Sequence, residues 1–385
     1  MLLGAKEPMT RLRELYEIYP AEPRATMPIG VRVDNWLYGS VSGIDLLSGR
    51  YSGDLLTQMP VAVEGMKHVL ATGGMQPANI QSIRVYRQRE DPRYFAALQS
   101  LFGAPADREA LGARLQVYDD PKQLAPGQHI RIDFTAAVGA NGLQAKMLTS
   151  GVKTAPDAVQ IGPVLWTPMV TAASAPDGAL PDGIEAQVAG AFDNLDRLLE
   201  REGVGRGQIL RIAGYMRDLK DKDLLNKTMV ERFPVWAEKP VHKYVPAGLP
   251  EGVEFALQAI AVDGAERRIL EIEGIKHNDP ISLGAQVGNV FVSSRVQARL
   301  EPTAREQAAR LIESHARRLV EEIGGSLEDV SQLVWGIGDP AFEADVRDEC
   351  AQHWPPGDLP RIDFMQAPFA HSPLPRLEFI ALVNR

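Results

Sequence analysis

Residues 183–262 decide the fold: GIEAQVAGAFDNLDRLLEREGVGRGQILRIAGYMRDLKDKDLLNKTMVERFPVWAEKPVHKYVPAGLPEGVEFALQAIAV. Apolar residues recur three and four positions apart in the first part of this stretch, at Ile184, Val188, Ala191, Leu195, Leu198 and Leu199. That spacing predicts a helix with one buried face, and Gly203 follows where a helix commonly ends. We expect the remaining elements in the order strand, helix, strand, strand, over residues 209–216, 223–233, 242–245 and 253–262.

The same order of elements occurs once before and once after this stretch. Before it, we expect a helix over 55–70, a strand over 83–86, a helix over 94–102 and strands over 114–117 and 130–134. After it, the corresponding elements span residues 303–323, 330–337, 342–350, 361–364 and 377–380. A period of roughly 120–130 residues is the size of a domain rather than of a solenoid repeat. The sequence therefore predicts three copies of one α+β domain.

The 385 residues divide into an arm and three domains on this interpretation. The arm covers residues 1–27, with a short helix expected over residues 11–19, and the domains cover residues 28–140, 145–270 and 276–385. The first strand of the second domain, which begins at Val164, runs into Pro168. Because proline cannot donate to a sheet ladder, we expect this strand to lie at a sheet edge or to be bulged.

Composition and charge exclude several classes of protein. A net charge of -9 and the lack of a Lys/Arg-rich run argue against a nucleic-acid partner. No apolar run is long enough for a signal peptide or a membrane helix, so we expect no membrane association. The single cysteine, Cys350, excludes an internal disulfide and suits a reducing compartment. We therefore expect a cytoplasmic protein.

Residues 280–294 of the third copy read PISLGAQVGNVFVSS. This segment resembles the opening of the Rid (YjgF-type) family of enamine/imine deaminases, where Pro-Tyr-Ser leads to a Val-Gly-Asn strand and a Ser-Gly pair. The third copy has Ile281 in place of the tyrosine and Ser293-Ser294 in place of Ser-Gly. The second copy resembles the family at residues 184–187, Asn194, Tyr215, Asp218, Asn226, 249–250 and 253–254. The resemblance covers nearly the whole chain after residue 28.

The resemblance implies an architecture. Family members are small domains that form trimers with a ligand cleft at each subunit interface and no cofactor. Three copies in one chain then imply three chorismate-mutase-like (Rid-like) domains arranged as an intramolecular pseudo-trimer, either monomeric or associating into a higher homo-oligomer. Each domain has a mainly antiparallel sheet backed by two helices, and the other face of the sheet must be buried against a neighbour.

The resemblance also implies site residues. An arginine before the penultimate strand holds the substrate carboxylate, and the planar guanidinium suits this role because it binds a carboxylate bidentately. The matching residues are Arg114 and Arg361, and the acidic residues on the last strand that help to position water are Asp133 and Glu378. The second copy has no arginine at this point, so a cleft there needs a different anion site. The other substrate-binding candidates are His242, Lys243, Ser293 and Ser294.

The function implied is a cofactor-free hydrolase or deaminase. It acts on a C–N bond (imine, enamine or related) of a small carboxylate-bearing metabolite at an inter-domain cleft. One alternative is a non-catalytic binding protein of the same family. Another is a cyclic-amide ring-opening hydrolase, which looks to use Ser-Lys pairs in three similar domains, although no lysine follows Lys276. The seven histidines are scattered and form no His-Glu-x-x-His motif, so we expect no metal site.

Overall fold

The structure is a computed structural model of the chain. It describes residues 13–16, 30–33, 36–45, 50–51, 53–88, 115–119, 124, 127–137, 146–149, 156–161, 164–167, 169–174, 180–235, 238–247, 249, 251–264, 266–272, 281–297, 301–355, 358–366 and 375–383. Helices and sheets both contribute, and the fold is of the α+β class.

Most strands belong to three six-stranded sheets. The first sheet has the order β1 (Arg13–Tyr16), β2 (Gly30–Val33), β3 (Trp36–Ser42), β8 (Ile130–Ala137), β6 (Ile80–Arg87), β7 (Leu115–Asp119). The second has β13 (Val241–Pro246), β12 (Ile209–Met216), β14 (Phe255–Val262), β11 (Val164–Trp166), β10 (Pro156–Ile161), β9 (Lys146–Thr149). The third has β15 (Arg268–Leu270), β16 (Gly284–Val287), β17 (Val290–Ser293), β20 (Arg376–Leu382), β18 (Val330–Ile337), β19 (Arg361–Gln366). A small ribbon joins β4 (Ile44–Asp45) and β5 (Arg50–Tyr51).

The three sheets share one connectivity. A three-strand antiparallel meander leads to the last strand of the sheet, which pairs antiparallel with a central strand. The central strand then pairs in parallel with one neighbour: β6 with β7, β12 with β13, and β18 with β19. The prediction of mainly antiparallel sheets is therefore confirmed for the described strands.

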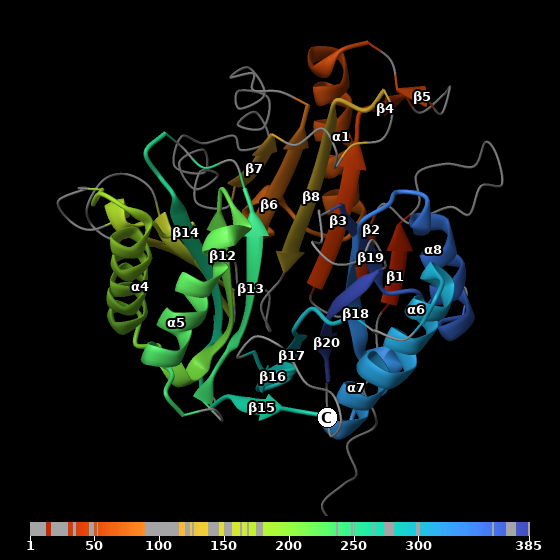
Figure 1. Cartoon of the computed structure of the whole chain (residues 1–385). Helices are drawn as coiled ribbons and strands as arrows, with labels where there is room; N and C mark the ends of the chain where they lie inside the picture. The colour runs from red at the N-terminus through yellow and green to blue at the C-terminus, as the bar shows by residue number, and fades with distance from the viewer. Residues whose placement is uncertain are drawn as a thin grey trace, which may run out of the picture.

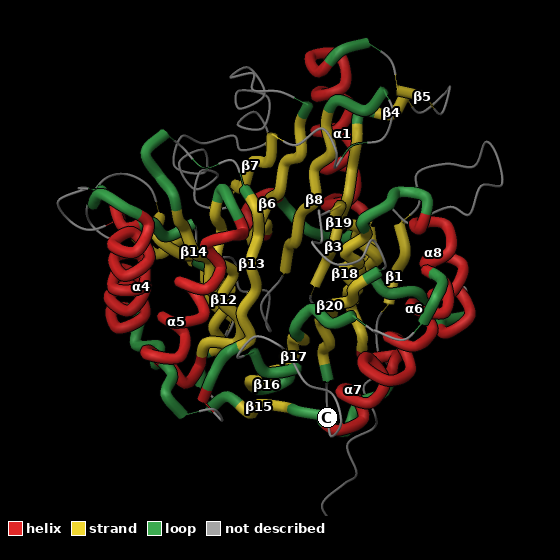
Figure 2. Tube along the Cα trace, in the orientation of Figure 1, coloured by secondary structure: helices red, strands yellow, loops and turns green. Residues whose placement is uncertain are grey.

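The helices lie on the outside of the sheets (Figures 1 and 2). They are α1 (Leu55–Thr72), α4 (Ile184–Arg201), α5 (Lys222–Arg232), α6 (Ala304–Leu311), α7 (Arg318–Glu322) and α8 (Phe342–His353), with a π-helical segment, Ile312–Arg317, between α6 and α7. Short 3-10 turns span Pro77–Asn79, Ala172–Ser174, Arg206–Gln208, Leu219–Asp221 and Leu327–Asp329. Asp54 caps α1, because its carboxylate accepts hydrogen bonds from the backbone N–H groups of Leu56 and Thr57.

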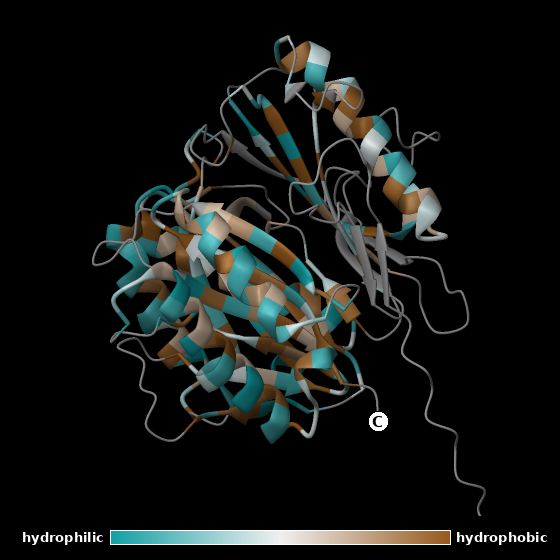
Figure 3. Ribbon diagram, turned by 90° about the vertical axis from the view of Figure 1, so that its right-hand side faces the viewer, coloured by the Kyte–Doolittle hydropathy of each residue, from teal (hydrophilic) through white to brown (hydrophobic). Residues whose placement is uncertain are grey.

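Each sheet has one face on its own helices and one face toward the other sheets. Along β20, Leu377, Phe379 and Ala381 pack in a core with residues of α6, α7 and α8, while Ile380 and Leu382 join a different core. Successive strand residues point to opposite faces, so this alternation separates the two cores. Figure 3 shows the corresponding mixture of hydrophobic and hydrophilic residues along helices and strands.

The second of these cores contains buried side chains from all three sheets. The first sheet contributes Trp36 and Tyr38, the second contributes Trp166 and Leu210, and the third contributes Val292, among others. The rings of Trp36 and Trp166 lie 6.0 Å apart between centroids and join the first sheet to the second. We call this set the central core. It fixes the sheets face to face, so polar groups at its margin lie between sheets.

Two local expectations are wrong. Within residues 11–19, the part that the structure describes is strand β1 rather than helix, because four residues pair antiparallel with β2. Of the two alternatives for the strand before Pro168, the edge position is wrong, since β11 lies between β14 and β10. The pairing is irregular there, because Trp166 pairs with Ile260 and the next pair is Val170 with Leu257. Strand β11 avoids the proline by ending at Trp166, two residues earlier.

Several further elements differ from expectation in extent. Strands β9 and β10 precede Val164, where the first strand of the second domain was expected, and β15 pairs with β16 of the third sheet, which places the start of that sheet before residue 276. The helix expected over residues 94–102 lies outside the described residues. The predicted helices of the second and third copies are confirmed, the long one of the third copy being interrupted by its π-helical segment.

Candidate functional site

Three residues occupy the same place on the last strands of the three sheets. The pairing of each central strand with the last strand of its sheet shifts register near the start of the central strand. At the same distance beyond this shift, Asp133 pairs with Arg84, Gln258 with Ala213, and Glu378 with Val334. Strand alternation directs all three toward the neighbouring sheets and away from the helices. The first and third sheets therefore carry a carboxylate at this place, and the second carries an amide.

Glu378 forms an ion pair with Lys243 between the third and second sheets. The Lys243 Nζ atom donates to Glu378 Oε1 at 2.7 Å, and the Arg295 guanidinium donates to Glu378 Oε2 at 3.0 Å. Only 12% of the Lys243 and Arg295 side chains and 4% of the Glu378 side chain are exposed. Arg211 on β12 acts electrostatically on the same carboxylate. We call these four residues the Lys243–Glu378 cluster.

Burial and the neighbouring charges shift the pKa values in this cluster. Burial alone would raise the pKa of the Glu378 carboxyl, but Lys243, Arg295 and Arg211 outweigh it and hold the pKa well below its usual range. Burial is the main cause that lowers the pKa of Lys243 to about 7; Glu378 opposes this shift, and Arg211 and Arg295 add to it. The carboxylate is therefore ionised, while the amine changes protonation state near neutral pH.

The cluster contains three cationic side chains and only one carboxylate. The Nε atom of Arg295 is buried without a hydrogen-bond partner. The Arg211 guanidinium makes no hydrogen bond or ion pair to any residue that the structure describes, and burial lowers its pKa. A half-buried guanidinium and an unpartnered N–H beside a paired carboxylate together attract an anion.

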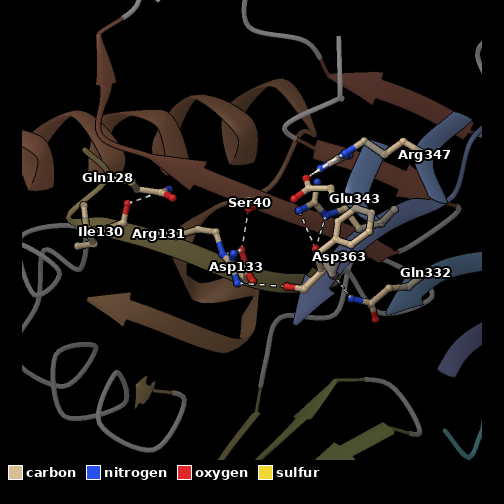
Figure 4. Close-up of polar contacts among 11 residues, drawn as sticks. Ser40, Gln128, Ile130, Arg131, Asp133, Gln332, Glu343, Arg347 and Asp363 are labelled. Atoms are coloured by element: carbon tan, nitrogen blue, oxygen red, sulfur yellow. Dashed lines mark hydrogen bonds and ion pairs between the residues drawn. The ribbon is translucent and has the colours of Figure 1, made fainter. Parts of the chain in front are cut away.

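A second polar group lies between the first and third sheets (Figure 4). Asp133 Oδ1 accepts a hydrogen bond from Ser40 Oγ at 2.7 Å and lies 3.3 Å from Arg131 Nε. The Arg131 guanidinium also donates to the backbone carbonyl of Phe364 on β19 at 3.5 Å. Its carbon lies 4.1 Å above the centre of the Tyr86 ring. Arg131 thus joins the last strand of one sheet to the parallel strand of another.

Asp363 is the second carboxylate of this group. Its Oδ1 atom lies 2.8 Å from Arg361 Nε and 2.6 Å from an Arg361 terminal nitrogen, and its Oδ2 accepts from Gln332 Nε2 at 2.5 Å. Burial alone would raise the pKa of Asp363, but Arg361 and Arg84 hold it below its usual range. We call Arg84, Arg131, Asp133, Arg361 and Asp363 the Asp133–Asp363 cluster. In it the Arg361 guanidinium already holds a carboxylate of its own chain.

No protein-family model matches the chain. A RutC family protein from Aquifex aeolicus (strain VF5) is 31% identical over 86 residues, which are 22% of this chain and 69% of that protein. The chain belongs to the RutC family. The matched length is much shorter than this RutC-family chain, so the similarity to this relative concerns only the matched part.

Solved structures similar to the RutC-family chain cover comparable portions. RidA from the Antarctic bacterium Psychrobacter sp. PAMC 21119 is 23% identical, covers 30% of this chain and 94% of its own, and has a TM-score of 0.27. The YjgF gene product of E. coli is 27% identical, with coverages of 28% and 87% and a TM-score of 0.26. A YjgF/YER057c/UK114 family member from Mycobacterium tuberculosis is 22% identical, with coverages of 31% and 98% and a TM-score of 0.26.

The structure brings together some of the predicted site residues of this RutC-family chain. Lys243 and Glu378 are in direct contact, and Asp133 and Arg361 belong to one cluster between the first and third sheets. Arg114 lies outside the described residues. The register that pairs Gln332 with Arg361 pairs Arg211 with Val241, so the second sheet has valine where the third has the arginine.

The predicted residues Ser293 and His242 make contacts of a structural kind. Ser293 Oγ accepts a hydrogen bond from the Phe379 backbone N–H at 2.8 Å and donates to the Ser294 carbonyl at 3.0 Å, which fixes the end of β17 on β20. His242 Nε2 lies 3.0 Å from Asn226 Oδ1 of α5, on the helix-facing side of β13. Lys243, the next residue, faces the other sheets, so the two side chains lie on opposite faces of β13. Ser294 is buried and its N–H donates to the Leu283 carbonyl at 2.8 Å.

Sequence reasoning missed Arg211, Arg295, Arg131 and Asp363. Arg295 directly follows the Ser293-Ser294 pair, and Asp363 lies two residues beyond Arg361 on the same strand face. Their position next to predicted site residues is a sequence signal that could have identified both. Arg211 and Arg131 carry no such signal, because one arginine on a strand looks the same in sequence whether it faces solvent or another sheet.

Three further features concern the described part of the chain. It contains no group of three His, Cys, Asp or Glu residues placed to hold a metal ion. It also contains no helix with the length and apolar character needed to cross a lipid bilayer. Cys350 of α8 is buried in a core with residues of α6, α7 and β18, and burial raises its pKa to about 12.

Proposed function

We propose that this RutC-family chain is an intramolecular pseudo-trimer of Rid-like domains, whose sheets lie within residues 13–137, 146–262 and 268–382. The common connectivity of the three sheets and the central core that they share support this arrangement. In a cyclic arrangement, the parallel strand of each sheet meets the last strand of the next. The Lys243–Glu378 contact, from β13 to β20, and the Arg131–Phe364 contact, from β8 to β19, both follow this rule.

We further propose that the chain hydrolyses a C–N bond of a small carboxylate-bearing imine or enamine at the Lys243–Glu378 cluster. The observation that carries this proposal is the gathering of three cationic side chains around one buried carboxylate. Such an arrangement attracts an anionic substrate and at the same time offers a fixed hydrogen-bond acceptor beside it.

The substrate carboxylate would bind Arg211 and the free Nε–H of Arg295. Both groups can donate without breaking a hydrogen bond that the structure shows. Charge-assisted hydrogen bonds from guanidinium to carboxylate are short and about twice as strong as neutral ones. This pair takes the anion-binding role that the second sheet lacks because Val241 stands at its arginine position.

Glu378 would orient the attacking water. Since its pKa is held low, the carboxylate accepts a hydrogen bond from water rather than removing its proton completely. Water adds to the imine carbon, the imine nitrogen takes up the protons, and the C–N bond breaks to leave ammonia and a 2-oxo acid. Positioning and acid–base assistance of this kind typically contribute about 10²–10⁴-fold to rate.

We assign the Asp133–Asp363 cluster a secondary place in this function. Arg361 would bind a substrate carboxylate there only by exchanging it for Asp363, which it holds through two nitrogens at 2.8 and 2.6 Å. Asp133 would then be the equivalent of Glu378. The exchange costs a buried ion pair, so we expect the Lys243–Glu378 cluster to be the working site.

The test is release of ammonia and 2-oxo acid from imines formed in place by an amino acid oxidase acting on a panel of amino acids. We expect the wild-type chain to accelerate release, and Glu378→Gln and the double variant Arg211→Gln/Arg295→Gln to lose most of the acceleration. Glu254→Gln, a change on the segment before β14, is the matched control. Saturable binding of a 2-oxo acid without turnover of any imine would support the non-catalytic alternative, and turnover of cyclic ureides alone would support the ring-opening alternative.

A further inference from the structure

The amine of Lys243 lies in a setting that suits covalent chemistry. Its side chain is 12% exposed, its Nζ atom is 2.7 Å from Glu378 Oε1, and Arg211 and Arg295 flank the same carboxylate. An anion bound by the two arginines would lie near the amine, because all three groups surround Glu378. An amine beside a carboxylate-binding position lies close to the carbon next to any carboxylate bound there.

We propose that Lys243 is a nucleophile that forms a Schiff base with the C2 carbon of a 2-imino or 2-oxo acid whose carboxylate is bound by Arg211 and Arg295. This inference rests on the proposed function, because it uses the same anion-binding pair. It adds a covalent step and names the substrate class as acids that carry a C=N or C=O group at C2.

The step balances without an added reagent. The Nζ lone pair attacks C2, the C=N electron pair moves to the imine nitrogen, and that nitrogen takes a proton. The resulting diamine expels ammonia as C2=Nζ forms, and Nζ gives its proton to the leaving nitrogen. Water then adds to C2, and the C2–Nζ bond breaks as C=O forms. The sum is imine plus water giving 2-oxo acid plus ammonia, with Lys243 regenerated.

The surroundings keep the amine available as a nucleophile. A pKa of about 7 leaves a large fraction of Lys243 neutral at physiological pH, as covalent catalysis by lysine requires. Besides its hydrogen bond to Lys243, Glu378 accepts one from Arg295, so the carboxylate retains a cationic partner when Lys243 turns to the substrate. Glu378 is also placed to orient the water that releases the product.

The direct test is reductive trapping on the wild-type chain. Pyruvate, the simplest 2-oxo acid of this kind, is added with cyanoborohydride, and the modified lysine is located by peptide mass spectrometry. We expect one reduced pyruvate adduct per chain on Lys243, formed at least tenfold faster than on Lys220, whose side chain is 72% exposed. Uniform low labelling of exposed lysines, with none on Lys243, overturns the inference.

A pair of variants separates covalent chemistry from simple attraction of the anion. Lys243→Arg keeps the cation beside Glu378 but cannot form a Schiff base, so ammonia release should fall at least a hundredfold while inhibition by pyruvate persists. Lys243→Cys restores an amine after treatment with bromoethylamine, and the only other thiol, Cys350, is buried. Activity should return on treatment of Lys243→Cys and not on treatment of Lys243→Ala.

The outcomes distinguish this inference from the proposed function. If Lys243→Arg releases ammonia at the wild-type rate, the Schiff base is excluded and hydrolysis by water alone stands. If wild type traps pyruvate on Lys243 but hydrolyses no imine, the covalent inference stands and the proposed hydrolysis fails. The trapping result uses only the wild-type chain, so it does not depend on the folding of any variant.

Discussion

Lys243 on β13 and Asp363 on β19 occupy the same place in their sheets with opposite charge. Each is the third residue of a strand that pairs in parallel with its central strand, opposite Ala213 in one sheet and Val334 in the other. At one junction a cation therefore meets the carboxylate of the next sheet. At the other junction the carboxylate needs arginines around it. This difference leaves three cationic side chains around one carboxylate in the Lys243–Glu378 cluster and three arginines around two carboxylates in the Asp133–Asp363 cluster.

The first prediction concerns the stability that Glu378 provides. Glu378→Gln leaves Lys243, Arg295 and Arg211 without their shared counter-charge, and we expect it to lower the free energy of unfolding by about 3–5 kcal/mol. Lys243→Met in the same chain removes one of the stranded cations and should recover part of the loss. Urea unfolding of the wild type, both single variants and the double variant measures the coupling, and additive effects would contradict the contact.

The second prediction concerns the pH dependence of stability. The folded-state pKa of Lys243 is about 7, below its ordinary value of 10.5, so between these values the unfolded chain binds a proton that the folded chain does not. The free energy of unfolding should therefore rise with pH in this range, by at most about 1.4 kcal/mol per pH unit from this group. Below pH 7 both states are protonated and the contribution is flat.

The measurement for this second prediction compares the pH dependence of the unfolding free energy in two chains. Urea unfolding from about pH 7 to about pH 9 is compared between the wild type and Lys243→Met, because other groups titrate equally in both. The wild-type curve should rise more steeply than that of the variant. Parallel curves would show that the amine titrates normally.

Local patterns made much of the fold predictable from sequence. The apolar spacing that ends at Gly203 matches α4, which ends at Arg201, and the short apolar run after it matches β12. Both signals lie within one element. Strands β9 and β10 gave no such signal because their pairing depends on β11, a neighbour supplied by the tertiary fold.

The site was predictable only residue by residue. The resemblance implied Glu378 as a site residue, and Lys243 was a candidate in the copy that lacks the arginine. The contact between them, however, joins residues 135 positions apart in the chain. No spacing rule reaches that far, since it depends on how the sheets face one another across the central core. Arg361 and Asp363 are two residues apart in the sequence. A charged pair on a predicted strand is, however, usually interpreted as part of a solvent-exposed surface.

The third prediction separates a structural from a binding role for Ser293. Its hydroxyl accepts the Phe379 backbone N–H, and Thr167 does the same for Ala259 in the second sheet at 2.8 Å. Ser293→Ala leaves a buried N–H unpaired, so we expect a loss of about 1–3 kcal/mol in unfolding free energy. The KM for the anionic substrate should stay unchanged. A raised KM at unchanged stability would show that Ser293 binds the substrate.

The last prediction concerns Asp363 as an internal occupant of an anion site. The Arg361 guanidinium holds the Asp363 carboxylate with two nitrogens, in the way that the resemblance implies for a substrate carboxylate. Asp363→Asn removes this charge, so an external anion can take the place of the Asp363 carboxylate beside Arg361 and Arg84. We expect calorimetric titration with pyruvate to show one site in the wild type and two in Asp363→Asn. Asp348→Asn, an exposed change on α8, serves as the control, and adding Arg361→Gln should remove the second site. Unchanged stoichiometry in Asp363→Asn, in a chain that still unfolds cooperatively, would show that Arg361 cannot take an outside carboxylate and that its role is to join its strand to the neighbouring sheet.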